Sequence, residues 1–339
     1  MHVAVVHDRV TGTGALDAVD VLAQADAVEA ALAYLGHTSV RLSCALDLAD
    51  VRGRLLNSGA DMVMNLVESI EGKGRLIHLF PFLLDAMGLP YTGARAEAML
   101  FTSNKLLAKR KMTAAGIPTP PWVAVREEAE SDPDAAGPSP AAWIVKSVWE
   151  HASIGLDETS IIRGVDRKAM CAVLKARSTA PGDDYFSEGF VEGREFNLSL
   201  LAGPDGPVVL PPAEIIFEGY TKDMPRIVDY SAKWDEGTYA FHHTPRRFDF
   251  EPMDRTLLES IKTLSLRCWK CFDLSGYARV DFRVDEAGSP WVLEVNANPC
   301  LSPDAGFAAA LDRAGISMAE AVTRILNDAN VFHKGLIDG

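Results

Sequence analysis

Four polar residues in two short apolar segments have the types and the spacing that bind a metal ion together with phosphate. Arg279 and Asp281 alternate with apolar residues in one segment, and Glu294 and Asn296 do so in the next. Alternate residues of a strand share one face, so an antiparallel hairpin would bring the four side chains together. Carboxylate and amide oxygens suit Mg²⁺, which completes its shell with phosphate and water. The structural alternative is a buried salt bridge of Arg279 with Asp281 or Glu294, with Asn296 capping a turn.

A lysine at the end of another apolar segment is the next candidate. Lys146 follows Trp-Ile-Val in a predicted strand at residues 142–147. Burying an unpaired charge is costly, so a lysine in this position needs an anionic partner. An isolated surface lysine would instead be solvated.

The first 95 residues alternate between strand and helix patterns. Short apolar runs predict strands, and stretches with apolar residues at helical spacing predict helices. The strands are expected at residues 3–7, 39–42 and 61–66, and the helices at 16–35, 48–58 and 76–87. This alternation predicts a parallel sheet covered by helices, in a unit that closes near residue 95.

The rest of the chain is richer in strands. Helices are expected at residues 104–115, 168–177 and 253–272, and strands at 142–147, 186–191, 195–202, 208–217, 277–284 and 291–295. The polar stretch 218–248 shows only weak periodicity and exceeds the usual length of a connection in a compact domain. We therefore expect it to be functional or disordered.

Composition limits the class of protein. The chain has 339 residues, of which 48% are hydrophobic and 24% charged, so it is expected to form two or three globular units. Its net charge of -14 argues against a nucleic-acid or membrane partner. There is no basic leader and no run of about 18 apolar residues, which predicts a cytoplasmic protein. Cys268 and Cys271 lack a second ligand pair, so we expect helix cysteines and no zinc or redox site.

Residues 104–306 resemble the ATP-grasp superfamily, specifically the D-alanine–D-alanine ligase group, with its motifs in the same order and at similar spacing. Residues 88–93 are similar to the group's domain junction. The resemblance implies an α/β protein, α+β in its ATP-binding part, with three domains. They are an N-terminal parallel α/β domain (1–95), a central ATP-grasp subdomain (96–185) and a C-terminal subdomain (186–330) with a lid loop at 218–248.

The resemblance also implies the residues that bind ATP and metal. Lys105 and Lys146 would reach the α- and β-phosphates, and the γ-phosphate would contact Ser153 in the turn 150–155 and Lys233 on the lid. Glu188 and the backbone of Phe190 and Val191 would hold the adenine, and Glu195 would hold the ribose. Asp281, Glu294 and Asn296 would hold one or two Mg²⁺ ions, with Mn²⁺ as an alternative. Arg279 would stabilise the transferring phosphoryl group and then the oxyanion.

The implied reaction joins a small carboxylate to an amine. ATP phosphorylates the carboxylate, ADP leaves, and the amine attacks the acyl phosphate to give an amide or peptide bond. Arg279, Lys233 and Ser153 are the implied catalytic residues. The resemblance implies small-molecule substrates and a homodimer formed through the N-terminal unit.

The substrate side departs from the group's pattern. Ala152 stands where the group has a hydroxyl-bearing residue, and Trp234 stands where it has a tyrosine. Cys300 replaces a glycine, and Ala305-Gly306 replaces a Ser-Leu pair. Glu71, in contrast, keeps an acidic residue at a place similar to the group's substrate wall. The expected substrate residues are thus Glu71, Trp234, Arg279, Cys300, Ala305 and Gly306. ATP handling is expected to be intact and D-alanine selection altered, which predicts another amino acid or a peptide as substrate. The alternatives are a D-alanine–D-alanine ligase with a variant pocket and a non-catalytic nucleotide-binding sensor.

Overall fold

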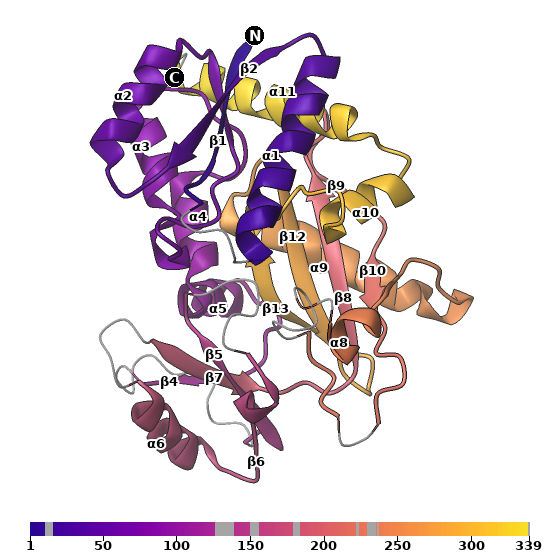
Figure 1. Cartoon of the computed structure of the whole chain (residues 1–339). Coiled ribbons are helices and arrows are strands. Elements are labelled where there is room, and N and C mark those ends of the chain that lie inside the picture. The colour runs from indigo at the N-terminus through magenta and orange to yellow at the C-terminus, as the bar shows by residue number, and fades with distance from the viewer. Residues whose placement is uncertain are drawn as a thin grey trace.

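The computed structural model describes residues 1–10, 16–125, 139–149, 156–178, 184–221, 224–228, 235 and 237–337. The strands in these ranges form three sheets. Figure 1 shows the N-terminal sheet at the top, the sheet of residues 122–189 at the bottom left, and the largest sheet between them on the right. The α/β fold class is confirmed, with one parallel and two antiparallel sheets.

The N-terminal sheet is parallel, as the alternating pattern predicted. Its central strand β1 (His2–Asp8) lies between β2 (Thr38–Cys44) and β3 (Met62–Asn65). Helices α1 (Leu16–Tyr34), α2 (Leu48–Ser58) and α3 (Leu79–Met87) accompany it. The apolar run in β1 is buried because both faces of the sheet are covered. The carboxyl ends of β1 and β3 therefore meet at one edge.

The second sheet is antiparallel and has the order β4-β7-β5-β6. Its strands are β4 (Trp122–Ala124), β5 (Ala142–Ser147), β6 (Ile161–Arg163) and β7 (Tyr185–Gly189). Helix α6 (Arg167–Arg177) packs on it through Met170 and Leu174. Because β7 pairs with β4 and β5, residues 186–189 belong to this sheet, and the boundary expected after residue 185 falls inside β7.

The third sheet carries the predicted hairpin. Its order is β11-β10-β8-β12-β13, with β9 paired to β8. The strands are β8 (Arg194–Leu201), β9 (Val208–Val209), β10 (Ala213–Ile215), β11 (Arg246–Arg247), β12 (Tyr277–Val284) and β13 (Pro290–Asn296). Helix α9 (Arg255–Phe272) contributes to the same core, with Cys268 buried against it and Cys271 at its border. The two cysteines lie on one helix, as expected.

The last helix returns to the N-terminal unit. The remaining helices are α4 (Ala96–Ser103), α5 (Lys105–Ala114), α8 (Tyr239–His242), α10 (Gly306–Arg313) and α11 (Met318–Ile337), with short 3-10 turns at Gly74–Leu76, Glu158–Ser160 and Pro252–Asp254. Val322 and Ile325 of α11 share a core with Val28 and Leu32 of α1, which lies beside it in Figure 1. None of the helices in the described ranges is long and apolar enough to cross a membrane.

Candidate active site

A cavity of about 500 Å³ lined by both antiparallel sheets gathers most of the predicted site residues. The predicted residues that line it are Lys105, Lys146, Glu188, Phe190, Val191, Glu195, Arg279, Asp281, Glu294, Asn296, Cys300, Ala305 and Gly306. Ser153, Lys233 and Trp234 lie outside the described residues. The described residues of the polar stretch 218–248 that line the cavity are Ile227, Val228, Phe241, Thr244, Pro245 and Arg246.

The hairpin brings the four polar side chains together, as the alternating pattern predicted. In the antiparallel pair of β12 and β13, Arg279 lies opposite Asn296, and Asp281 lies opposite Glu294. A register shift follows Asp281, and the pairing then resumes with Phe282 opposite Val292. These two carboxylates, the amide and the guanidinium of Arg279 therefore line the cavity from one ribbon, which also carries Arg283.

Arg279 and Asp281 form a bidentate ion pair. Nε and Nη2 of Arg279 donate to the two carboxylate oxygens over 2.8 Å each, and Asn197 Nδ2 donates to Oδ1 over 2.8 Å. Burial lowers the pKa of Arg279, but attraction to Asp281 outweighs burial and the pKa is raised. A carboxylate has about four lone-pair directions, so these three hydrogen bonds leave Asp281 room for a metal ion. The salt-bridge alternative is thus present without excluding metal binding.

The lysine-bearing side of the cavity is organised around Glu188, which is 1% exposed. Its two carboxylate oxygens contact Lys146 Nζ at 2.6 Å and Lys109 Nζ at 2.5 Å. Burial alone would raise the pKa of Glu188, but the two lysines hold it below its usual range. Burial likewise lowers the pKa of Lys146, and the attraction of Glu188 reverses this. Lys146 therefore has the anionic partner that its position required.

Lys109 is a site-supporting residue that sequence reasoning missed. Its ammonium group also donates to Thr119 Oγ1 over 2.7 Å, and that hydroxyl donates to the carbonyl of Val292 in β13 over 2.8 Å. Lys109 lies one helical turn after Lys105 in α5, so the i, i+4 spacing of two lysines was the available signal. The chain of contacts links the two antiparallel sheets.

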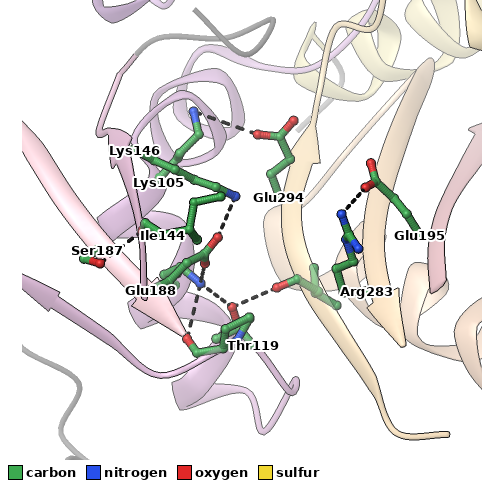
Figure 2. A network of polar contacts seen from close by, with 12 residues as sticks. Lys105, Thr119, Ile144, Lys146, Ser187, Glu188, Glu195, Arg283 and Glu294 are labelled. Atoms are coloured by element: carbon green, nitrogen blue, oxygen red, sulfur yellow. Dashed lines mark hydrogen bonds and ion pairs between the residues drawn. The ribbon is translucent and has the colours of Figure 1, made fainter. Parts of the chain in front are cut away.

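The lysines and acids reach the cavity from two sides (Figure 2). Lys105 Nζ lies 3.9 Å from Glu294 Oε2, and Arg283 Nη2 lies 2.8 Å from Glu195 Oε2. The position of Lys105 follows from its helix, because Asn104 caps α5 by accepting from the N–H of Leu107 over 2.9 Å. Lys105 thus starts the helix at the cavity wall.

Phe190 and Val191, whose backbone is expected to hold the adenine, directly follow β7. The N–H of Phe190 already donates to the carbonyl of Ala142 over 2.9 Å. Only its carbonyl oxygen is therefore left for a ligand. The ring of Phe190 lies 5.9 Å from the guanidinium of Arg283, which covers the side of the cavity that carries Glu195.

Two further acids of the cavity, Glu68 and Asp20, form what we call the acidic wall, and sequence reasoning missed them. Glu68 and Asp20 line the cavity, whereas Glu71 does not, is exposed and has a left-handed backbone with φ 52°. Gln24 Nε2 donates to Glu68 over 3.1 Å, and Cys300 Sγ to Asp20 over 3.1 Å. Glu68 lies in the segment just after β3, which ends at Asn65, and ligands of parallel sheets bind at the carboxyl ends of the strands. That position was the signal.

Burial, with the nearby Asp8 and Asp20, raises the pKa of Glu68 to about 8 from an ordinary 4.5. Between these values the folded protein holds a proton that the unfolded chain releases. The free energy of unfolding therefore falls as pH rises from about 5 to 8, and Glu68→Gln should remove this loss, about 1–3 kcal/mol at pH 8.

Thermal melts of both proteins from pH 5 to pH 8 check this expectation. The melting temperature of Glu68→Gln should rise relative to that of the parent protein as pH increases. Glu71→Gln in the same loop is the matched control and should not reproduce the gain, because that side chain is exposed. Parallel curves for the parent and Glu68→Gln would contradict the buried, proton-holding carboxyl group.

Comparison with known proteins agrees with this geometry. Residues 112–327 match the family described as "D-ala D-ala ligase C-terminus". The D-alanine–D-alanine ligase of Moorella thermoacetica is 32% identical over 305 residues, which cover 86% of this chain and 90% of the relative. The uncharacterized protein y4sG of Sinorhizobium fredii is 31% identical, with 92% and 90% covered.

Solved structures show the same fold. A crystal structure of D-alanine–D-alanine ligase from Bacillus anthracis complexed with ATP superposes with a TM-score of 0.71 at 20% identity, and 99% of each chain is covered. The architecture is therefore that of the ATP-grasp ligases, an ATP-dependent, ADP-forming class that joins a carboxylate to an amine. The chain belongs to the D-alanine–D-alanine ligase C-terminus family, and the predicted resemblance is confirmed.

Proposed function

We propose that this protein phosphorylates the carboxylate of one amino acid and joins it to the amine of a second amino acid or a peptide. The observation that carries the proposal is the place of Arg279 in the cavity. Its charge acts on Asp281 and Glu294 on the phosphate side and on Glu68 at the acidic wall. The phosphoryl group that moves from ATP to the substrate carries negative charge, and a guanidinium between the two sides of the cavity can stabilise it during transfer.

The reaction uses ATP as phosphoryl donor. A carboxylate oxygen of the first substrate attacks the γ-phosphorus, and ADP leaves. The amine of the second substrate attacks the carbonyl carbon of the acyl phosphate and loses a proton, and inorganic phosphate leaves. The protein supplies positioning and charge neutralisation. Arg279 stabilises the negative charge that develops in both steps.

We propose that Asp281, Glu294 and Asn296 hold Mg²⁺, with Mn²⁺ as the alternative. The donors are oxygens, and the described residues contain no group of three or more His, Cys, Asp and Glu that would form a complete protein-made site. This suits an ion that takes few protein ligands and leaves positions for phosphate and water. When bound, the ion neutralises charge on the phosphates.

Each of the predicted nucleotide-binding residues is proposed to contact a particular part of ATP. Phosphate contacts are assigned to Lys105, Lys146, Ser153 and Lys233, ribose contacts to Glu195, and adenine contacts to Glu188, Phe190 and Val191. Because both oxygens of Glu188 already contact lysines, we propose that its main part is to position Lys146.

The substrate half differs from D-alanine recognition in its side chains. The acidic wall of Glu68 and Asp20 supports a substrate that carries an ammonium group, since opposite charge stabilises the buried carboxylate. Cys300, which contacts Asp20, and Ala305 and Gly306 also line the cavity. The alternative, a D-alanine–D-alanine ligase, is favoured by the names of relatives such as that of Moorella thermoacetica. A non-catalytic sensor does not agree with the ligase class.

We propose three domains, with the boundaries near residue 95 and after β7 instead of at residue 185, since β7 completes the four-stranded sheet. We propose a homodimer formed through the N-terminal unit and a cytoplasmic location, where ATP is available. Size-exclusion chromatography with light scattering tests the first of these two.

The deciding experiment measures ADP release with Mg²⁺-ATP and a panel of D- and L-amino acids, singly and in pairs, with mass spectrometry of products. Release that needs a pair, gives a condensed product and stops with EDTA supports the proposal. Fastest turnover with D-alanine alone would assign the D-alanine–D-alanine alternative. Binding of Mg²⁺-ATP without release for any pair would contradict an amino acid ligase.

A further inference from the structure

Arg283 is a buried cation of the cavity that the proposed reaction leaves without a part. The residue is 4% exposed and yet lines the cavity. Alternate residues of a strand share one face, so Arg283 continues the row that Arg279 and Asp281 begin on β12, and all three line the cavity. A second arginine in this row is costly to bury unless it meets a carboxylate. The neighbouring strand supplies that carboxylate.

The partner of Arg283 is Glu195 of β8, which lies opposite it in the antiparallel register. Arg283 Nη2 lies 2.8 Å from Glu195 Oε2, and the two side chains are 5% and 12% exposed (Figure 2). Removing one partner of a pair buried to this degree leaves an uncompensated charge. A carboxylate has about four lone-pair directions, so it can accept from a guanidinium and from a hydroxyl at the same time. The pair therefore orients the carboxylate that we assign to the ribose.

Other contacts fix the direction of the Arg283 guanidinium itself. Nη1 donates to the carbonyl oxygen of Gly193 over 3.3 Å, and Nη2 donates to the carbonyl oxygen of Arg226. The ring centroids of Phe190 and Phe217 lie 5.9 Å and 5.5 Å from Cζ, within the range of cation–π attraction. Several segments of the chain therefore hold the guanidinium, and the carboxylate beside it takes its direction from a fixed group.

The order of the residues along β12 follows the order of the groups along ATP. Arg279 is assigned to the transferring phosphoryl group, and Asp281 is assigned to the metal ion on the phosphates. Arg283 lies two residues further along the strand, which is about 6.6 Å. Phe190, whose backbone is assigned to the adenine, lies beside its guanidinium. Arg283 therefore stands at the ribose end of the nucleotide site, away from the reacting groups.

We propose that Arg283 is a positioning residue for nucleotide recognition, which holds the carboxylate of Glu195 in the direction that accepts hydrogen bonds from the ribose hydroxyls. The inference rests on the proposed function and deepens its nucleotide site. Because Arg283 acts through Glu195, its loss should weaken the binding of nucleotides that carry ribose hydroxyls. The KM values of the amino acid substrates should not change.

The test compares the affinities of Mg²⁺-ATP and Mg²⁺-2′,3′-dideoxy-ATP, which lacks both ribose hydroxyls, by isothermal titration calorimetry. The parent protein should bind ATP about tenfold to a hundredfold more tightly, because the analogue cannot donate to the charged carboxylate. Arg283→Met should weaken ATP binding until the two affinities are nearly equal, with the affinity for dideoxy-ATP little changed. Arg283→Lys keeps the charge without the fork of donors and should retain part of the preference.

Arg247→Met is the matched control. Arg247 is an arginine of the same sheet with a carboxylate partner, Glu214, and with the ring of Phe250 at 5.8 Å. Neither Arg247 nor Glu214 lines the cavity. The control should therefore keep the preference of the parent protein for ATP over dideoxy-ATP.

A double variant keeps the test decisive where Arg283→Met fails to fold with an unpaired Glu195. Arg283→Met combined with Glu195→Gln leaves neither charge behind. If Arg283 acts only through Glu195, the double variant should bind both nucleotides as Glu195→Gln alone does, because the two changes affect one contact. A weaker affinity for ATP in the double variant than in Glu195→Gln would overturn the inference.

Three further outcomes separate the inference from the proposed function. A folded Arg283→Met protein that keeps the parent's preference for ATP would overturn the inference alone. An equal loss of affinity for both nucleotides would do the same, because the guanidinium would then act on the phosphates or the base. Equal affinities of the parent for the two nucleotides would overturn the assignment of Glu195 to the ribose as well, and absence of ATP binding would overturn the proposed function.

Discussion

Replacing Arg279 by methionine is expected to lower kcat by about a hundredfold to a thousandfold. Removing one donor that stabilises a developing oxyanion costs about 2.7–4 kcal/mol of transition-state stabilisation. Arg279 is held in place by two hydrogen bonds of 2.8 Å to Asp281, so its guanidinium is oriented before the substrates bind. The measurement is steady-state ADP release at saturating Mg²⁺-ATP and substrates.

The variant also removes the partner of Asp281, which is 7% exposed, and its stability must be measured separately. Asn197 still donates to that carboxylate, which limits the damage. Arg279→Lys is the matched control: it keeps the charge and loses the bidentate geometry, so its kcat should lie between those of Arg279→Met and the parent. A kcat of Arg279→Met within tenfold of the parent, in a folded protein, would remove Arg279 from the chemical step.

The hairpin of the active site was predictable because its sequence carries two independent signals. Strand β12 has the expected bounds, and β13 extends the expected range by one residue at each end. Apolar residues at every second position show which face of the strand packs into the core. The charged residues between them are costly to bury unless each meets an oppositely charged group or a metal ion. Arg279 and Asp281 satisfy both conditions, which is why their meeting with Glu294 and Asn296 could be predicted from the sequence, whereas the register of β12 with β13 is seen only in the structure.

The acidic wall was misplaced because neighbouring residues of a turn cannot be told apart by type. Glu68 and Glu71 stand three residues apart after β3, and only the end of the strand decides which carboxylate reaches the cavity. Glu71 adopts a left-handed backbone in the turn that follows, and its side chain is exposed. A ranking by distance from the end of the parallel strand would have selected Glu68.

Arg246 and helix α11 were missed for different reasons. Strand β11 has two residues and pairs with β10 across about thirty residues of chain, so the local sequence contains no alternating pattern that predicts a strand there. Helix α11, in contrast, has buried apolar residues at helical spacing, among them Val322 and Ile325. That pattern was readable. Its packing on α1 was not, because long-range contacts depend on the whole fold.

Glu188→Gln is expected to lower the free energy of unfolding by about 3–5 kcal/mol, since it leaves Lys109 and Lys146 as buried ammonium groups without their carboxylate. The measurement is denaturation by urea. Glu192→Gln is the matched control in the same segment. Its pair with Arg163 has side chains 57% and 58% exposed, and the change should stay within about 1 kcal/mol.

Two further measurements separate a positioning role for Glu188 from adenine binding. Lys109→Met in the Glu188→Gln background should recover part of the lost stability, because it removes one of the two uncompensated charges. Mg²⁺-ATP should raise the melting temperature of Glu188→Gln more than that of the parent, because phosphate then supplies the missing charge at Lys146. If Glu188 mainly held the adenine, Glu188→Gln would keep the parent's stability, and its only defect would be a weaker affinity for ATP.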